Sequence, residues 1–259
     1  MPSDEADLDA RLLAEHVLGW TTERYVADSN QTEPNGFQKA FDALLTRRAR
    51  REPFAYIVGH QEFWGRDFEV TPAVLIPRPE TELLVEIAKS LGGQRVCDVG
   101  AGSGCVAVSI KLECPSADVA AVDVSRAALD VARRNAALHR AHVTFVESDL
   151  FANVDGMFDL IVSNPPYVAE RDRPTTQPEV RDYEPATALF AGDDGLDVIR
   201  RVVAGAPERL RPGGHLVFEF GYGQADAVAQ LISETPKLRM IELRRDLQDI
   251  PRAAIAQRV

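Results

Sequence analysis

Residues 95–104 read Arg-Val-Cys-Asp-Val-Gly-Ala-Gly-Ser-Gly. This stretch predicts a short apolar strand that runs directly into a glycine-rich loop, after which a helix begins. Glycines let the backbone turn tightly and approach a ligand closely, and the first turn of a helix offers free N–H donors. A second predicted strand ends at Asp123, 19 residues after Gly104, where a carboxylate can accept hydrogen bonds from ribose hydroxyls. The order of these elements therefore predicts a nucleoside-binding site.

The spacing of the glycines favours a ligand built on one adenosine over NAD. A dinucleotide site calls for the pattern G-x-G-x-x-G, whereas here the third glycine arrives one residue early. Gly100 alone could form a simple turn and Asp123 alone could cap a helix, but the ordered set favours a ligand site. The residues expected to contact the nucleoside are Gly100, Ala101, Gly102, Ser103, Gly104 and Asp123.

Strands and helices alternate from residue 94 onward, and the helix predicted over 125–138 begins at Ser125, whose hydroxyl can cap its first turn. Such alternation predicts an α/β fold with a parallel sheet covered on both faces, so that the ligand lies across the carboxyl ends of the strands. The parallel strands are predicted over 95–99, 117–122, 143–146, 158–163 and 215–220. Two late segments, 238–243 and 253–258, are expected to form an antiparallel pair.

Residues 1–60 predict a small helical domain with a modest core of its own. Apolar residues recur at helical spacing at Leu8, Leu12, Leu13 and Val17, and again at Phe37, Phe41, Leu44 and Leu45. Residues 61–80 predict a hairpin that turns at Gly65-Arg66-Asp67, followed by a connector stiffened by prolines. We place the α/β domain over residues 81–259.

The chain of 259 residues carries 40 acidic and 29 basic side chains, for a net charge of −11. Proteins that hold duplex DNA or bulk RNA neutralise phosphates with Lys and Arg, so this balance disfavours stable nucleic-acid binding.

No apolar run reaches the roughly 20 residues that span a bilayer, and no membrane association is expected. The cysteines, Cys97, Cys105 and Cys114, fit neither a disulfide framework nor a zinc site. We therefore expect no metal and a cytoplasmic location.

Basic residues are concentrated in one stretch of the sequence, Arg47-Arg48-Ala49-Arg50-Arg51. It ends a predicted helix, where cations complement the helix dipole. We interpret it as a solvated helix end, with a docking surface for an acidic or nucleic-acid-bound partner as the alternative.

Asn164-Pro165-Pro166-Tyr167 follows the apolar run over 160–163. Two consecutive prolines fix two φ angles and remove two backbone donors, and the residue before a proline is held extended. The side-chain oxygen of Asn164 and the carbonyl of Pro165 can accept the two hydrogens of a planar –NH2 group, while Tyr167 packs nearby. A proline turn that only ends the strand is the alternative.

The segment Ser148-Asp149-Leu150-Phe151 follows the third predicted strand. Asp149 can accept a hydrogen bond from an adenine amino group while Leu150 or Phe151 covers the ring. Asp149 can equally well cap a turn, and the residues alone leave both interpretations open.

With the glycine loop, Asp123 and the N-P-P-Y segment in this order, the sequence resembles the class I S-adenosylmethionine methyltransferases, and among them those that methylate an amide or exocyclic amino nitrogen. The stretch over 75–82, Leu-Ile-Pro-Arg-Pro-Glu-Thr-Glu, is similar to the signature of the HemK/PrmC family, which methylates the glutamine of the Gly-Gly-Gln loop in class-1 peptide release factors. The resemblance covers residues 8–258. Further matching segments are Glu52-Pro53, Tyr56-Ile57-Val58-Gly59, Tyr183-Glu184-Pro185, Ala188-Leu189, Gly192, Asp194-Gly195-Leu196, Arg211-Pro212-Gly213-Gly214, Glu219-Phe220-Gly221 and Gln224.

The resemblance implies a Rossmann-like, mostly parallel sheet of seven strands, with a helical N-terminal domain that docks the release factor. It implies S-adenosylmethionine as methyl donor, S-adenosylhomocysteine as product, and catalysis by positioning without a metal or a covalent intermediate. The residues implied to be catalytic are Asn164, Pro165 and Tyr167, joined by Pro166 in binding the substrate amide. Those implied to hold the cofactor, besides the glycine loop and Asp123, are Asp149, Leu150 and Asn164.

Some features and alternatives qualify this assignment. The sequence departs from relatives at Leu75 and Leu150, where they often carry an aromatic ring that can stack on the cofactor. An adenine-N6 nucleic-acid methyltransferase would use the same Asn164 pocket on a flipped base, and ribosomal-protein glutamine methyltransferases share N-P-P-Y. A non-catalytic nucleoside-binding protein is a further alternative, whereas the glycine spacing disfavours an NAD-dependent dehydrogenase.

Overall fold

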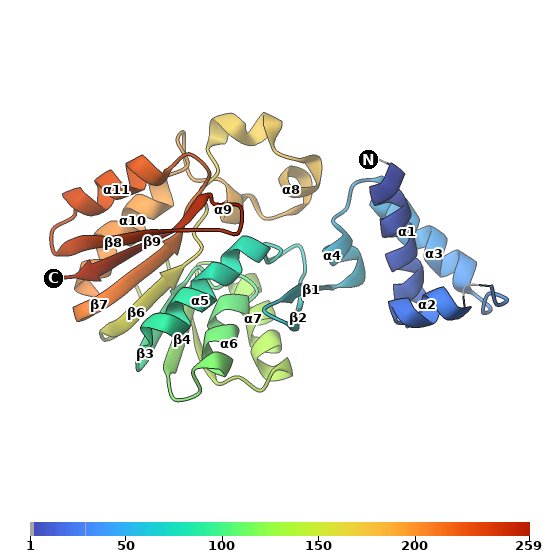
Figure 1. The fold of residues 1–259 in the computed structure, drawn as a ribbon, viewed down its shortest axis with the longest axis horizontal. Coiled ribbons are helices and arrows are strands. Elements are labelled where there is room, and N and C mark those ends of the chain that lie inside the picture. Colours follow the sequence, from blue (N-terminus) through green and yellow to red (C-terminus); the bar gives the residue numbers. More distant parts are fainter. Residues whose placement is uncertain (1–2, 29) are drawn as a thin grey trace.

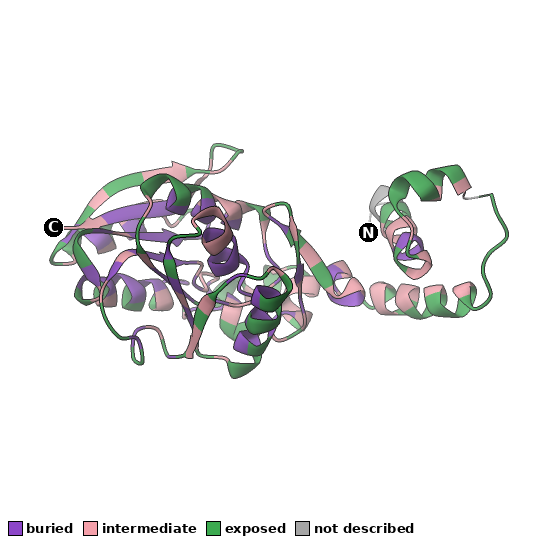
Figure 2. Cartoon of the chain, turned by 90° about the horizontal axis from the view of Figure 1, so that it is seen from below, coloured by how far each residue is buried: buried purple, intermediate pink, exposed green. Residues whose placement is uncertain are grey.

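The computed structural model describes residues 3–28 and 30–259. It divides visibly into a helical N-terminal part and a larger α/β part (Figure 1). The N-terminal part is built from α1 (Ser3–Leu18), α2 (Thr22–Asp28), α3 (Phe37–Ala49) and α4 (Phe54–Val58). Within residues 6–28 and 30–50, Leu13, Ala14 and Glu15 of α1 are the buried ones. Figure 2 shows α1, α2 and α3 mostly exposed or half-buried, whereas Ala55, Tyr56 and Ile57 of α4 are buried.

A two-stranded antiparallel hairpin, β1 (His60–Phe63) and β2 (Arg66–Glu69), connects the two parts. Its turn is shorter than the sequence predicts. Trp64 and Gly65 have φ values of 55° and 69°, as required for a two-residue hairpin turn that matches the strand twist. Arg66 and Asp67, expected in the turn, therefore pair with Phe63 and Glu62 in the second strand.

The described part of the α/β domain holds a seven-stranded sheet in the order β5-β4-β3-β6-β7-β9-β8. Its strands are β3 (Arg95–Val99), β4 (Asp118–Asp123), β5 (Val143–Glu147), β6 (Phe158–Ser163), β7 (Leu210–Glu219), β8 (Leu238–Arg245) and β9 (Pro251–Arg258). Neighbouring strands are parallel except where β9 pairs with β7 and β8. This arrangement confirms the predicted fold and the antiparallel pair at its end.

Strand β7 begins earlier than the predicted start at 215. The residues Arg211-Pro212-Gly213-Gly214 have the composition of a turn, but Leu210 already pairs with Phe158 of β6. The register is irregular between Phe158 and Leu160, which absorbs the proline and glycines into the strand.

Helices cover both faces of the sheet, as the alternation predicts. On one face pack α5 (Glu82–Leu91), α6 (Cys105–Glu113) and α7 (Arg126–Leu138), and on the other α10 (Asp197–Gly205) and α11 (Ala225–Glu234). In β3, Val96 joins the first cluster and Cys97 the second, which explains why neighbouring positions of the strand are both apolar. The hydroxyl of Ser125 accepts a hydrogen bond from the Ala128 N–H over 3.2 Å, so it caps α7 as expected.

The N-terminal part also touches α8 (Pro178–Tyr183) of the α/β part. The Glu179 carboxylate pairs with Arg51 at 3.2 Å and with Arg48 at 3.7 Å, and the Tyr183 hydroxyl donates to the Arg50 carbonyl at 2.6 Å. Arginines of the basic cluster at the end of α3 are thus engaged within the chain.

Candidate active site

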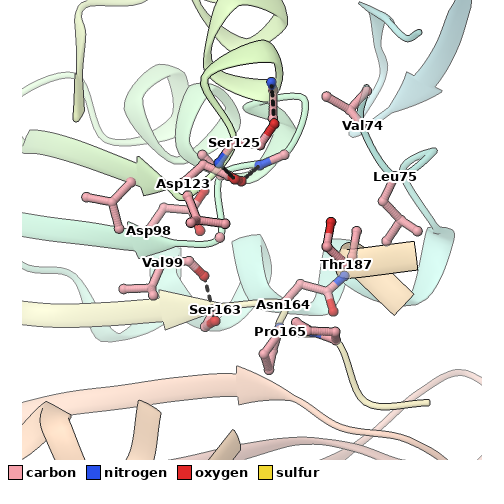
Figure 3. Close-up of a pocket in the computed structure, with 18 of the residues that line it drawn as sticks. Val74, Leu75, Asp98, Val99, Asp123, Ser125, Ser163, Asn164, Pro165 and Thr187 are labelled. Carbon is pink, nitrogen blue, oxygen red and sulfur yellow. Dashed lines mark hydrogen bonds between the residues drawn. The ribbon is translucent and has the colours of Figure 1, made fainter. Parts of the chain in front are cut away.

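The site lies at the carboxyl edge of the sheet, where the strand order changes direction. From β3 the chain continues to β4 and β5 on one side, whereas β6 and β7 lie on the other, and such a crevice is where α/β sheets bind ligands. A cavity of about 240 Å³ opens there, lined by residues from the glycine loop, the end of β4, the end of β6 and the proline-rich connector. Figure 3 shows Asn164 and Pro165 at the end of β6, with Asp123 further along the same edge.

The glycine loop owes its shape to residues that adopt positive φ. Gly100, Gly102 and Gly104 have φ values of 88°, 52° and 80°, a region that other residues enter at a steric cost. A Cβ atom on Gly104 would also lie 3.0 Å from the Cβ of Ala132 in α7. The loop is fixed by the N–H groups of Gly100 and Ala101, which both donate to the Val122 carbonyl at 2.8 Å.

Asp123 is held with one hydrogen bond on each carboxylate oxygen. Oδ2 accepts from the Gly102 N–H at 2.9 Å and Oδ1 accepts from the Ser125 N–H at 2.8 Å. Each oxygen has a second lone pair, and the side chain lines the cavity. Asp123 can therefore accept further hydrogen bonds from a ligand in the cavity. Its position is the one at which the sequence predicts a ribose contact.

Asp98 is a cavity residue that the sequence reasoning missed. It is the fourth residue of β3, is buried, and its Oδ2 atom has no hydrogen-bond partner. Burial raises the pKa of Asp98 to about 8. A buried polar atom without a partner calls for an explanation, and a ligand in the cavity is one. The signal was present in the sequence as a lone acid inside an otherwise apolar strand.

The two apolar residues of the segment after β5 take different places in the structure. Leu150 lines the cavity, whereas Phe151 is buried against α10, where a Cβ on Gly205 would come within 2.7 Å of its ring. The Asp149 carboxylate is half-exposed at the cavity edge and pairs with Arg201 of α10 at 2.7 Å. Leu150, and not Phe151, is thus the residue of this segment that can cover a bound ring.

Asn164 and the two prolines that follow it line the cavity. The Asn164 side-chain NH2 group donates to the Thr81 hydroxyl at 2.9 Å, which leaves its Oδ1 atom as the acceptor for a substrate. Thr81 belongs to the Pro-Glu-Thr-Glu segment, in the 3-10 turn η1 (Pro79–Thr81) before α5. The two motifs that the sequence singled out separately are therefore joined by a hydrogen bond.

Tyr167 follows the two prolines in the chain but is not among the residues that line the cavity. Its hydroxyl donates to Oε1 of Glu219, the last residue of β7, at 2.9 Å. The neighbouring carboxylate and burial together raise the pKa of the Tyr167 phenol well above its ordinary value. Sequence reasoning expected this ring near the planar amide, and it did not anticipate its bond to Glu219.

An ion pair between a partly exposed arginine and a buried glutamate fixes the connector at the cavity. The Arg78 guanidinium binds Glu184, whose other oxygen accepts from the Ile76 N–H at 3.0 Å. Glu184 is buried, and both Arg78 and Pro185 line the cavity. This pair links the Arg-Pro-Glu-Thr-Glu segment to the Tyr-Glu-Pro segment 106 residues later.

Residues 3–28 and 30–259 show neither a metal-binding cluster nor a membrane-spanning helix. No group of three or more His, Cys, Asp or Glu side chains there could hold a metal ion. No helix in the same residues has the length and apolar character needed to cross a membrane.

The chain is similar to known proteins over most of its length. The family model for the PrmC N-terminal domain matches residues 2–59, and that for the methyltransferase small domain matches residues 79–179. A release factor glutamine methyltransferase of Bordetella pertussis is 44% identical over 252 residues, which cover 95% of this chain and 92% of that protein. One from Geobacter sulfurreducens is 51% identical over 195 residues, or 74% and 69% of the two chains.

Solved structures show the same fold at low sequence identity. A crystal structure of a methyltransferase from Pyrococcus furiosus is 16% identical and covers 84% of this chain and 98% of its own, with a TM-score of 0.58. A ribosomal protein L11 methylase from Lactobacillus delbrueckii is 21% identical with a TM-score of 0.52, over 70% of this chain and 80% of that one. These two likenesses concern the fold alone.

Proposed function

This chain belongs to the release factor glutamine methyltransferase family, and we propose that it methylates the side-chain nitrogen N5 of the glutamine in the Gly-Gly-Gln motif of class-1 peptide release factors. S-adenosylmethionine is the proposed methyl donor. Catalysis is proposed to take place at Asn164 and Pro165, without a metal.

One observation carries the assignment of the substrate group. The NH2 group of Asn164 is already bonded to Thr81, so its Oδ1 atom is left to accept from a ligand, and Pro165, whose carbonyl group we propose as the second acceptor, lines the same cavity. Two acceptors side by side match the two hydrogens of a planar –NH2 and do not match a hydroxyl or a thiol. A glutamine side chain brings such a group on a flexible stem that can enter a narrow site.

The residues beside Asn164 fit the proposed donor. The glycine loop and Asp123 would hold its ribose, Leu150 would cover its adenine ring, and the unpaired Oδ2 atom of Asp98 would form a hydrogen bond with a polar group of the donor. When bound, S-adenosylmethionine supplies an electrophilic methyl group. The half-exposed Asp149 is bonded to Arg201, and we propose that it contacts the adenine amino group from the cavity edge.

The protein's own contribution is orientation. An amide nitrogen is a weak nucleophile because its lone pair is delocalised into the carbonyl group. Acceptors at Asn164 and Pro165 would align that nitrogen with the methyl group, and alignment of reacting atoms accounts for a large part of enzymatic rate enhancement. The same acceptors favour the positive charge that develops on the nitrogen in the transition state. Tyr167 does not line the cavity and would support the Asn164-Pro165 segment through the hydrogen bond of its hydroxyl to Glu219.

We further propose that the N-terminal helices grip the release factor, and that the enzyme works in the cytoplasm. The first proposal rests on the largely exposed surfaces of α2 and α3, which have no buried residue. The second rests on the free thiols of Cys97, Cys105 and Cys114, which are typical of a reducing compartment.

The test uses labelled S-adenosylmethionine and a purified release factor, with mass spectrometry to locate the methyl group. We expect label on the glutamine of Gly-Gly-Gln, and none after substitution Asn164→Ala, although calorimetry should still detect cofactor binding by the variant. A ribosomal protein and an adenine-containing oligonucleotide serve as competing acceptors. Label on either of these instead of the release factor, or unchanged turnover by Asn164→Ala, contradicts the proposal.

A further inference from the structure

A chain of hydrogen bonds extends from Asn164 into the protein interior. The Asn164 amide donates to the Thr81 hydroxyl at 2.9 Å, and that hydroxyl donates to Oε2 of Glu219 at 2.8 Å. The other oxygen of Glu219 accepts from the Tyr167 hydroxyl at 2.9 Å. Thr81 and Glu219 each have a relative exposure of 2%. The chain joins four positions that lie up to 138 residues apart in the sequence.

The direction of these bonds is determined by one hydrogen atom. A threonine hydroxyl carries a single hydrogen, and Thr81 gives it to Glu219. Thr81 can then only accept from Asn164, so the Asn164 amide must turn its NH2 group to Thr81 and its oxygen to the cavity. The orientation of an amide side chain follows from its hydrogen-bond network. For Asn164 that network runs through Thr81 to Glu219.

The opposite direction is available if Glu219 carries a proton on Oε2. The carboxyl group would then donate to Thr81, and Thr81 would donate to the oxygen of Asn164. The amide would have to rotate by half a turn and present its NH2 group to the cavity. Two NH2 groups facing each other cannot form a hydrogen bond, so the substrate amide would lose one of its two acceptors.

We propose that Glu219, acting through Thr81, is a positioning residue that determines which end of the Asn164 amide faces the substrate nitrogen. This inference rests on the proposed function, because it specifies how the acceptor pair is kept in its working orientation. Glu219 does not line the cavity, whereas Thr81 and Asn164 do. Glu219 is therefore not itself a catalytic residue.

The surroundings of Glu219 make its proton equilibrium relevant to catalysis. Burial raises the pKa of Glu219, and the hydrogen bonds from Thr81 and Tyr167 oppose that rise. The charges that face it are Glu80, which raises the pKa further, and Arg252 of β9, which lowers it. As the pH falls through this raised pKa, Glu219 gains a proton and the working direction of the chain is lost. Methyl transfer should then decline on the acid side.

The test compares Thr81→Ser with Thr81→Val in the full-length protein, in single-turnover assays on a Gly-Gly-Gln release factor. Serine keeps the hydroxyl and valine keeps the shape. We expect Thr81→Ser to stay within about threefold of the wild type and Thr81→Val to lose roughly 10- to 100-fold in rate, as expected when a reacting group is mispositioned. The dissociation constant for S-adenosylmethionine should change little in both variants. Thr81→Val should lose stability because it leaves the buried Glu219 carboxylate without this donor, so both variants are assayed at a temperature at which circular dichroism shows them folded. Equal rates for the serine and valine variants would overturn the inference.

The pH dependence of the methyl-transfer rate is a second measurement. It would not respond to substitution of Glu219 if that residue had only a structural role. In the wild type the rate should fall on the acid side, and in Glu219→Gln that decline should disappear while the rate is lower throughout. Tyr167→Phe removes a donor to the carboxylate, so it should shift the decline to higher pH. An acid decline that is identical in wild type and Glu219→Gln would refute the role of Glu219. A wild-type enzyme that does not methylate the release factor would instead overturn the proposed function itself.

Discussion

Val99 and Ser163 lie side by side at the ends of β3 and β6, and the Ser163 hydroxyl donates to the Val99 carbonyl over 2.6 Å. The glycine loop starts directly after Val99, and the Asn-Pro-Pro-Tyr segment starts directly after Ser163. This buried bond therefore sets the distance between the part of the site that is proposed to hold the cofactor and the part that is proposed to hold the substrate.

Substitution Ser163→Ala should lower the free energy of unfolding and slow methyl transfer. It leaves the buried Val99 carbonyl without this partner, which costs about 1–3 kcal/mol. Urea denaturation measures the loss. The matched control is Ser109→Ala in α6, because Ser109 is also fully buried but its hydroxyl has no partner. If both substitutions cost the same, the Ser163 bond contributes nothing specific.

Substitution Asp123→Ala should raise the dissociation constants of S-adenosylmethionine and S-adenosylhomocysteine by a similar factor. The two molecules share the ribose that Asp123 is proposed to bind, and a hydrogen bond to a charged group contributes about 1.5–3 kcal/mol, or roughly tenfold or more. Calorimetry gives both constants.

Asp118→Ala is the control for this experiment, because Asp118 lies at the other end of the same strand and does not line the cavity. Dissociation constants that stay at the wild-type values in Asp123→Ala would remove Asp123 from the ribose role.

Local sequence was sufficient to predict the parts of the site that depend on backbone chemistry. The glycines of the loop after β3 adopt the positive φ values that only glycine enters freely, and the pair Pro165-Pro166 ends β6 as proline must. Both motifs follow strands whose apolar patterns are strong, so their meeting at one sheet edge follows from the parallel fold.

The remaining features depend on packing between distant segments, which no local pattern encodes. Thr81 meets Glu219 only because η1 packs beneath the end of β7, 138 residues later in the chain. Leu150 faces the cavity while Phe151 turns into the core, since Leu150 has a φ of 50°. A sequence that offers two adjacent apolar residues does not reveal which of them the backbone will turn toward the ligand.

Substitution Asp98→Asn should stabilise the protein more at pH 8 than at pH 5. The pKa of Asp98 is raised to about 8 in the folded chain, whereas an unfolded aspartate titrates near about 3.9. Between these values the folded state keeps a proton that the unfolded state has released, so the free energy of unfolding falls as pH rises. Asparagine has no such proton, and its advantage should reach about 1 kcal/mol or more at pH 8.

The experiment for Asp98 compares urea midpoints of wild type and variant at the two pH values. Asp118→Asn, the same substitution at an exposed position of the neighbouring strand, serves as the control. A stability difference between Asp98→Asn and wild type that is the same at pH 5 and pH 8 would show that Asp98 is already ionised in the folded protein.

Substitution Glu179→Ala should raise the KM for a whole release factor by roughly three- to tenfold and leave the KM for a short Gly-Gly-Gln peptide unchanged. The carboxylate ties α8 to Arg51 and Arg48 at the end of α3, so it fixes how the N-terminal helices are held against the catalytic part. Partly exposed ion pairs contribute only about 0–1 kcal/mol to stability, and the melting temperature should therefore hardly change. Glu170→Ala is the matched control, because Glu170 pairs with Arg173 within its own turn. If the KM for the whole factor is also unchanged in Glu179→Ala, the orientation of the N-terminal helices does not contribute to substrate binding.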